Sequence, residues 1–324
     1  MANDDIVPTL NWGLLYNKFF MTFNPYKAGK ENGKDKDKAY FFNLMLQGKM
    51  PNHKHVKQPR VLTVGPPKEL FNAVQNAVNS NQDDGLNIVC QRYQARQKSL
   101  VTSLLKQTGL QHIEMKDVIR TMTCSWRFVN GLSIPHLLGV NLLWHPTLGI
   151  PYLPGSALKG ILKSFLTDIY ADEDTASAND PAFTEMMQRV FGREVVSDRE
   201  VAEAVQEQQA GDYIFFDALP TKKMKFVVDI MTPHFRDWYT QGNQSPGQLN
   251  NTPNDWHDPV PISFLALEDF DLQLTVVPRP GAQIVDSDEL KFIMDMLCHA
   301  LSHQGAGAKT ALGYGYFQSR TDKN

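Results

Sequence analysis

Two segments of the chain repeat hydrophobic residues every three or four positions, with polar residues between them. The first segment carries Leu158, Ile161, Leu162, Phe165 and Leu166. The second carries Leu290, Ile293, Met294, Leu297 and Leu301. This spacing predicts two amphipathic helices, each with one buried face. Ser156 has the residue type of an N-cap for the first helix. Asp286 and Glu289 have the spacing of a capping box for the second.

Other segments are rich in β-branched and aromatic residues and predict strands. They are Met122–Val129, Tyr213–Phe216, Lys225–Ile230, Pro261–Leu267, Phe270–Val277 and Tyr314–Ser319. The second and third are expected to pair around a turn at Lys222–Lys223, and the fourth and fifth to form a hairpin. In the first, Trp126 is assigned to the core and Arg127 to the opposite face. The order strand, helix, strands, helix, strand predicts an α+β fold of the ferredoxin-like (RRM-like) βαββαβ type with large helical and loop insertions.

The remaining segments suggest a division of the chain into two parts. Residues 1–117 are expected to form a mainly helical N-terminal extension, with a helix at Val89–Thr108 that ends at Gly109. Residues 118–324 then form the main domain. It is expected to carry insertions at about 168–212 and 236–261, the latter rich in Gly, Asn, Pro and Gln. We expect a surface loop there.

Composition narrows the class of protein. The 324 residues are 42% hydrophobic and carry a net charge of −3, with three scattered cysteines that show neither a disulfide framework nor a zinc spacing. There is no apolar run of membrane-spanning length and no secretory start, so a cytoplasmic protein without a membrane partner is predicted. Charge is unevenly distributed. Residues 27–60 hold nine Lys/Arg against three Asp/Glu, and residues 166–212 hold three Arg against twelve Asp/Glu. A basic region can attract a phosphate backbone, although both runs are also compatible with solvated surface.

The segment Gly305–Gly315 contains four glycines together with Lys309 and Thr310. Exposed backbone N–H groups beside a lysine form an anion site, and glycine allows close approach to a ligand. The segment is not a P-loop, because Ala308 stands where that motif has glycine and the helix precedes the strand. A glycine-rich helix cap followed by a tight turn is the alternative.

A second motif, His145–Gly160, reads as a turn leading into the first amphipathic helix. Lys159 and Lys163 are four residues apart and share a face of this helix. A helix N-terminus attracts phosphate through its unpaired N–H groups. The alternative is an ordinary amphipathic helix with solvated lysines.

The two motifs together carry a family resemblance. Pro154–Gly160 resembles the helix start of the RAMP superfamily of CRISPR proteins, with Ser156–Ala157 where the family often has two serines. Gly305–Gly315 resembles the superfamily's C-terminal glycine-rich loop. Further segments, over about residues 118–318 and at the start of the chain, look like the sixth subunit family of type III-B (Cmr) effector complexes. They are Asn11–Tyr16, Phe215–Pro220, Val228–His234 and Asp258–Ile262.

This resemblance implies a RAMP version of the ferredoxin-like fold and a non-catalytic RNA-binding subunit that acts in antiviral defence. The subunit would hold the 3′ part of the guide (cr)RNA and cap one end of the RAMP filament. The implied partners are guide RNA, target RNA, the repeated RAMP backbone subunit, the small helical subunit and another end-capping RAMP subunit. The sheet face, flanked by the two motifs, is expected to form the groove for single-stranded RNA.

The expected RNA-binding residues fall into four groups by chemistry. Arg127, Lys159, Lys163 and Lys309 would contact phosphates, and Ser156 and Thr310 would donate hydroxyl hydrogen bonds. Gly305, Gly307, Gly313 and Gly315 would let the backbone approach the RNA. Tyr314 is the expected base-stacking residue.

Other chemistry receives less support from the sequence. His53–His55 and the pair Asp217 and Asp229 are weak candidates for a metal, so neither a metal nor a cofactor is predicted. His145 and His234 could act as general acid and base in a metal-independent RNA-processing endonuclease of the RAMP superfamily, which is the main alternative function. A protein scaffold that contacts RNA little is a third possibility.

Overall fold

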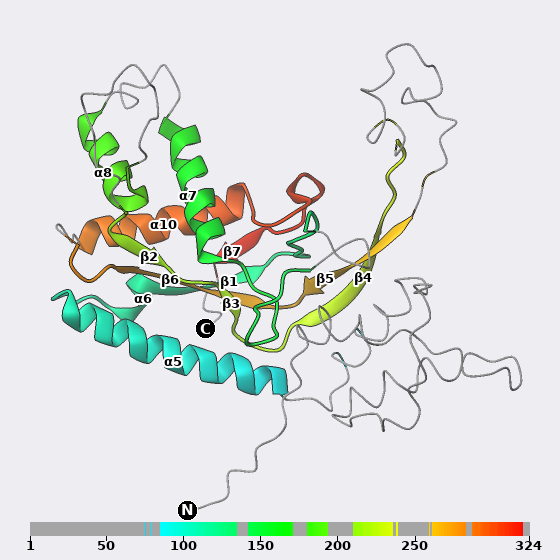
Figure 1. The fold of residues 1–324 in the computed structure, drawn as a ribbon, viewed down its shortest axis with the longest axis horizontal. Helices are drawn as coiled ribbons and strands as arrows, with labels where there is room; N and C mark the ends of the chain where they lie inside the picture. The colour runs from blue at the N-terminus through cyan, green and yellow to red at the C-terminus, as the bar shows by residue number, and fades with distance from the viewer. Residues whose placement is uncertain are drawn as a thin grey trace, which may run out of the picture.

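The structure is a computed structural model that describes residues 85–134, 142–170, 180–193, 210–235, 261–282 and 287–319, together with Gln75, Asn79, Trp238 and Pro259. Several sequence predictions lie outside these residues. They concern the basic segment 27–60, His53–His55, Asp286, most of the extension before residue 85 and most of both expected insertions. The described residues form an α+β fold, shown in Figure 1.

The main sheet is antiparallel and has the strand order β2-β6-β1-β7, with β3 also paired to β6. Its strands are β1 (Ile119–Cys124), β2 (Tyr213–Phe215), β3 (Leu219–Pro220), β6 (Asp271–Pro278) and β7 (Phe317–Ser319). The central pair β1–β6 is in register with Met122 opposite Leu272. Both residues are fully buried, because they point into the helical layer that covers one face of the sheet.

That layer consists of α7 (Gly155–Tyr170) and α10 (Ser287–His303), which pack against each other. Both helices follow the predicted spacing: every residue of the two expected apolar faces is buried apart from Ile161, which is half-buried. The ring of Phe165 stacks on His303 with ring centroids 6.4 Å apart. Gln304 donates a hydrogen bond of 2.8 Å to Asp168. A further helix, α8 (Pro181–Phe191), packs on α7 and β2.

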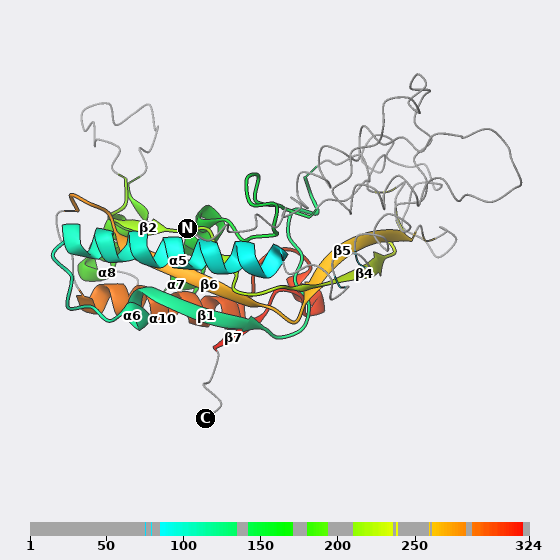
Figure 2. The ribbon, with the colours of Figure 1, turned by 90° about the horizontal axis from the view of Figure 1, so that it is seen from below.

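The opposite face of the sheet is covered by α5 (Gly85–Gln107), as Figure 2 shows from below. The α5 residues Cys90, Val101 and Leu105 are buried. Gln97, on the same side of the helix, accepts a hydrogen bond from Gln273 of β6. Every residue of β6 is consequently buried, whichever face it points to. The expectation that one sheet face lies open as an RNA groove is therefore wrong.

α5 ends as the sequence predicts. Gly109 has φ +77°, and the N–H of Leu110 donates to the carbonyl of Leu105 at 2.9 Å, which is the closing hydrogen bond of a glycine C-cap. A short helix, α6 (Met115–Val118), then leads into β1. Within the described ranges, none of the helices is both long and apolar enough to cross a membrane.

Two predicted strand pairings are wrong. β4 (Lys225–Met231) pairs with β5 (Ile262–Glu268), not with β2, and β5 does not form a hairpin with β6. The chain passes from β5 to β6 through Asp269, which has φ +53°. The chain bends at Asp269 but keeps its direction, so β5 pairs with β4 while β6, which follows it, pairs with strands of the main sheet. As a result β4 and β5 form a separate ribbon that extends away from the main sheet (Figure 1).

Candidate nucleic-acid interface

The segment Gly305–Gly315, called the glycine loop below, connects α10 to β7 and folds back on itself. The N–H of Ala306 donates to the carbonyl of Gly315 at 2.8 Å. The loop is also bound to the segment that follows β1. The N–H of Ala308 donates to the backbone carbonyl of Val129 at 2.8 Å, and the N–H of Gly315 donates to the backbone carbonyl of Arg127 at 2.7 Å. The loop is thus a fixed part of the domain, attached by main-chain hydrogen bonds.

Two of the glycines are required by this packing. A Cβ on Gly315 would lie 1.8 Å from the carbonyl oxygen of Ala306, and one on Gly307 would lie 2.4 Å from that of Val129. Gly305 and Gly313 also have positive φ. At Gly313 there is room, because a Cβ would meet only the Trp126 ring at 3.8 Å. The close approach that the sequence indicated therefore closes the loop on itself at Gly315 and attaches it to the segment after β1 at Gly307.

The outer part of the loop presents unused hydrogen-bond donors. Among the described residues, no acceptor is found for the backbone N–H groups of Gly307, Lys309, Thr310 and Ala311. Lys309 adopts a left-handed conformation with φ 63° and ψ 28°, and a 3-10 turn (Thr310–Leu312) follows it. Successive N–H groups in this conformation form an anion-binding concavity. The Lys309 Nζ atom lies 5.4 Å from the centroid of the Phe264 ring. These N–H groups and the Lys309 ammonium group can donate hydrogen bonds to phosphate oxygens.

Beneath the loop lies a polar cluster formed by Arg127, Lys225, Asp229, Glu268 and Tyr314. Arg127 donates from Nε to Glu268 at 2.7 Å and also binds Asp229. Lys225 Nζ lies 3.1 Å from the same glutamate. Two cations thus face two carboxylates, so the cluster is neutral overall. Arg127 was expected to contact phosphate, but its guanidinium is already paired inside the protein.

The pKa values of the cluster reflect this pairing. Burial raises the pKa of Asp229, but hydrogen bonds from Tyr314, the Ile230 N–H and Arg127 outweigh it and hold this pKa below its usual value. The pKa of Glu268 is lowered in the same way by Arg127 and Lys225, against the effect of burial. For Arg127, burial lowers the pKa while its hydrogen bonds raise it, and the net shift is upward. All three side chains are therefore charged at neutral pH.

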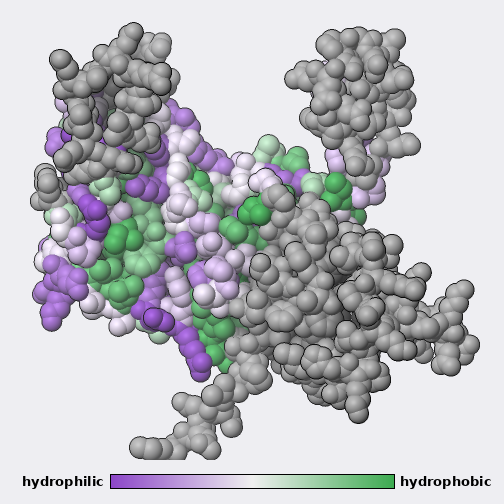
Figure 3. Space-filling view, in the orientation of Figure 1, coloured by the Kyte–Doolittle hydropathy of each residue, from purple (hydrophilic) through white to green (hydrophobic). Residues whose placement is uncertain are grey.

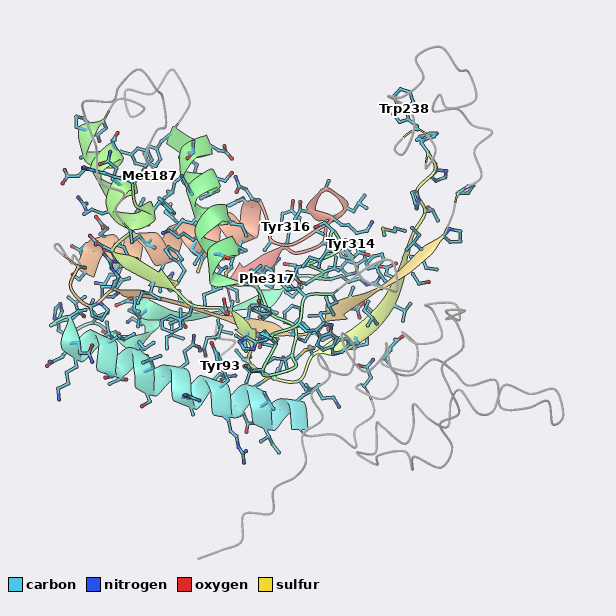
Figure 4. The ribbon with its side chains drawn as sticks, in the orientation of Figure 1. Tyr93, Met187, Trp238, Tyr314, Tyr316 and Phe317 are labelled. Carbon is cyan, nitrogen blue, oxygen red and sulfur yellow. The ribbon has the colours of Figure 1, made fainter. Side chains whose placement is uncertain are left out.

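The two aromatic residues of this region exchange the roles that the sequence suggested. Tyr314 is only 5% exposed. Its side chain extends from the glycine loop toward the β4–β5 ribbon (Figure 4) and donates its hydroxyl to Asp229. Burial and this hydrogen bond raise the pKa of Tyr314 to about 12. Stacking of Tyr314 on a base would require the ring to leave this position. Trp126, which was assigned to the core, is 48% exposed, so that assignment is wrong. The regular alternation of a strand does not apply to it, because β1 ends at Cys124.

The second motif also has an internal partner. α7 begins at Gly155, and the N–H of this residue donates to the carboxylate of Asp217 at 2.8 Å. Asp217 therefore caps the helix, and Ser156 is an exposed residue of the first turn, not the N-cap that was predicted. A Cβ on Gly155 would lie 2.1 Å from the carbonyl oxygen of Phe215, so glycine is required at this position.

The predicted lysines of α7 lie on its outer side. Lys159 is half-buried and Lys163 is exposed. Burial lowers the pKa of Lys159, and the nearby charges of Lys163 and Arg279 lower it further. A phosphate at this position would relieve that repulsion. The hydrogen bond between Asp168 and Gln304 places the far end of α7 beside the start of the glycine loop. Lys159 is therefore about 13 Å along the helix from that point, so a polynucleotide with several phosphates can reach both motifs.

The candidate catalytic residues are not brought together. His145 lies in the turn before Leu153, whose main chain pairs with Ala218, whereas His234 follows the outer end of β4. The Nδ1 atom of His145 accepts from the N–H of Leu148 at 3.3 Å, and burial lowers the pKa of its ring. Asp217 and Asp229 are likewise separate, since one caps α7 and the other binds Arg127. In the part of the chain that the structure describes, no three His, Cys, Asp or Glu side chains could hold one metal ion.

Three residues of the site were not recognisable as such from the sequence pattern. Asp217 and Asp229 were considered only as metal candidates, and Glu268 was not considered. A signal was nevertheless present for Asp229, because it interrupts the apolar segment Phe226–Met231. A carboxylate in such a segment usually has a charged partner when the strand is buried.

Comparisons with known proteins identify relatives. The RAMP superfamily model matches residues 103–318. The CRISPR system Cmr subunit Cmr6 of Pyrococcus furiosus is 27% identical over 232 residues, which are 58% of this chain and 64% of that protein. The corresponding subunit of Saccharolobus solfataricus is 21% identical over 178 residues, which are 53% of this chain and 46% of that protein. The chain therefore matches less than two thirds of the length of either relative.

A solved structure is similar in fold. A chain of the cryo-EM structure of the type III-B Cmr-beta bound to cognate target RNA superimposes with a TM-score of 0.51 and 19% identity, covering 87% of this chain and 88% of that chain. At this identity the similarity concerns the fold alone. The superfamily match, in contrast, extends over about two thirds of the sequence and includes both the start of α7 and the glycine loop. The chain thus belongs to the RAMP superfamily.

Proposed function

We propose that this protein is an RNA-holding subunit of a type III-B CRISPR effector complex that acts in antiviral defence. The observation that carries the proposal is the row of unbonded N–H groups at Gly307, Lys309, Thr310 and Ala311, beside the ammonium group of Lys309. Membership of the RAMP superfamily and similarity to Cmr6 subunits support this type of complex.

In this proposal the glycine loop binds phosphates of the guide RNA in its 3′ part, and the outer face of α7 binds further phosphates. Lys309 and Thr310 serve the first contact, and Ser156, Lys159 and Lys163 serve the second. Arg127 acts indirectly, since it orients Asp229 and Tyr314 beneath the loop. Contacts of this kind position a polynucleotide without reading its sequence.

The proposed partners follow from the same assignment. They are guide RNA, target RNA, the repeated RAMP backbone subunit, the small helical subunit and another end-capping RAMP subunit. The protein would cap one end of the RAMP filament and work in the cytoplasm. It would not cleave RNA itself, because the two candidate acid–base residues, His145 and His234, lie on separate segments of the fold.

We also assign the fold to the ferredoxin-like class. The chain order β1, α7, β2, β6, α10, β7 and the antiparallel sheet order β2-β6-β1-β7 support a βαββαβ unit. The domain boundary near residue 117 stays a prediction. α5, which precedes that boundary, packs on the sheet of the main domain.

The test compares variants of the assembled complex. Lys159→Ala combined with Lys309→Ala should weaken guide-RNA binding and reduce the dependence of log Kd on log salt by about one to two. The matched control is Lys106→Ala, because this exposed lysine lies on α5, on the other side of the sheet. Equal affinity and an equal salt slope for the double variant and the control would contradict the proposed site.

A second measurement separates the proposal from the endonuclease alternative. The purified protein is incubated with repeat RNA in EDTA. We expect intact RNA. Cleavage that disappears in His145→Ala or His234→Ala would show instead that the protein is a metal-independent nuclease.

A further inference from the structure

Trp126 is exposed, although the residues two positions before and after it are buried. Cys124 and Phe128 are 7% and 1% exposed, whereas the indole of Trp126 is 48% exposed. Its main chain is held firmly on both sides. The N–H of Ser125 donates to the backbone carbonyl of Tyr316 at 2.8 Å, and the carbonyl of Arg127 accepts from the N–H of Gly315 at 2.7 Å. A large aromatic side chain on a rigid segment is thus presented to solvent, which is an energetic cost if nothing binds to it.

The ring itself is held in place by residues of the glycine loop and the polar cluster. Its centroid lies 4.9 Å from that of Tyr314, with the two planes inclined at 58°. The guanidinium carbon of Arg127 lies 4.9 Å from the Trp126 centroid, a cation–π distance. Arg127 is fixed in turn by Asp229 and Glu268. The indole is therefore oriented in advance, and half of its surface remains available to a ligand.

The exposed ring is next to the donors of the glycine loop. Gly313, whose Cβ position would lie 3.8 Å from the Trp126 ring, donates its N–H to the carbonyl of Thr310 at 2.9 Å. Only one turn of chain therefore separates the indole from the unbonded N–H groups of Lys309, Thr310 and Ala311. A phosphate bound by these groups would place the attached nucleoside near Trp126.

We propose that Trp126 is a base-stacking platform, on which one nucleobase of single-stranded RNA rests while a neighbouring phosphate occupies the donors of the glycine loop. The inference rests on the proposed function and adds a second kind of contact to the same site. Stacking of a base on an aromatic ring is independent of sequence, which suits a subunit that must accept any guide.

The surroundings favour a nucleobase over a protein partner. A protein docking site would need a continuous apolar patch. In the space-filling view, the surface between the α7–α8 pair and the outer end of the β4–β5 ribbon is a mosaic of hydrophilic and hydrophobic residues (Figure 3). The ring contacts the guanidinium group of Arg127 and the ring of Tyr314, and Gly313 lies beside it. The unbonded N–H groups of the glycine loop, one turn of chain away from Gly313, match an anionic polymer.

The experiment measures the affinity of the full-length protein for two probes, a short oligouridylate and an abasic ribose-phosphate chain of the same length. Trp126→Ala should weaken binding of oligouridylate about tenfold and leave binding of the abasic chain and the salt slope unchanged. Trp126→Phe, which keeps an aromatic ring, should restore most of the affinity. Lys309→Ala should weaken the binding of both probes, because both carry phosphates.

The outcomes distinguish this inference from the proposed function. If Lys309→Ala lowers the affinity for both probes but Trp126→Ala lowers the affinity for neither, the stacking platform is refuted and the phosphate site stands. If neither variant changes the affinity of either probe, both proposals fail. Leu312→Ala removes an apolar side chain of the 3-10 turn in the glycine loop, which is 65% exposed. If this variant and Trp126→Ala both release a protein subunit from the complex without changing RNA affinity, Trp126 is a protein contact and the inference is overturned.

Discussion

The carboxylate of Asp217 accepts a hydrogen bond from the backbone N–H of Gly155 at 2.8 Å, across 62 positions of sequence. The start of α7 is therefore fixed to the segment between β2 and β3. This helix carries Lys159 and Lys163, so the cap also determines where the two lysines lie relative to the sheet.

Removal of this cap should destabilise the fold. Asp217→Ala leaves the Gly155 N–H without its acceptor and should lower the free energy of unfolding by about 1 kcal/mol. The measurement is urea denaturation of the purified protein. Asp217→Asn keeps an acceptor oxygen, so it should lower the free energy of unfolding by less. If the Asp217→Ala and Asp217→Asn variants were both as stable as the wild-type protein, the cap would contribute nothing to stability.

The two glycines on either side of Tyr314 should differ in their tolerance of alanine. Gly313→Ala should cost about 1–2 kcal/mol, since the position has φ +91° but an open side-chain space. Gly315→Ala should cost considerably more, because its Cβ would overlap the Ala306 carbonyl oxygen. Thermal unfolding of both variants checks this order. A Gly315→Ala protein as stable as Gly313→Ala would show that the loop does not close as described.

The polar cluster should make stability depend on acid pH. The pKa values of Asp229 and Glu268 in the folded protein lie below their usual values of 3.8 and 4.5. Groups with lowered pKa stabilise the fold above their unfolded pKa values and lose this contribution as the pH falls through the folded values. Wild-type stability should therefore fall as the pH decreases from about 4.5.

The comparison for this prediction is the double variant Asp229→Asn with Glu268→Gln, which cannot titrate at either position. Its free energy of unfolding, measured by denaturant titration at each pH, should be lower at pH 7 and should change less between pH 5 and pH 3. Parallel pH profiles for the two proteins would mean that these carboxylates do not cause the acid sensitivity.

α5 should behave as an integral part of the main domain. Leu105→Ala removes a side chain that is 4% exposed, and it should lower the free energy of unfolding by about 2–5 kcal/mol. Leu100→Ala on the same helix is the matched control. That side chain is 47% exposed, so a change within about 0.5 kcal/mol is expected. Chemical denaturation of both variants provides the measurement. Equal effects would indicate that α5 does not pack on the sheet.

Much of the fold follows from local sequence. The buried faces of α7 and α10, the glycine that ends α5 and the position of β6 were predictable, because residue spacing and caps act over a few neighbouring positions. The first strand was expected at Met122–Val129, whereas β1 spans Ile119–Cys124. Strand partners were not predictable either. The kink at Asp269 has no local signal that separates it from a tight turn, so the predicted hairpin between β5 and β6 was wrong.

The sequence alone determined which segments of this protein carry the candidate RNA-binding chemistry, because glycine, lysine and helix-start residues stand together in two short motifs. Tertiary structure decided how each side chain is used. Tyr314 is buried and bound to Asp229, whereas Trp126 is exposed. α5 closes the sheet face, and Asp217 caps α7. These outcomes depend on contacts between residues far apart in the chain, and burial and charge pairing at such contacts exist only once the chain has folded.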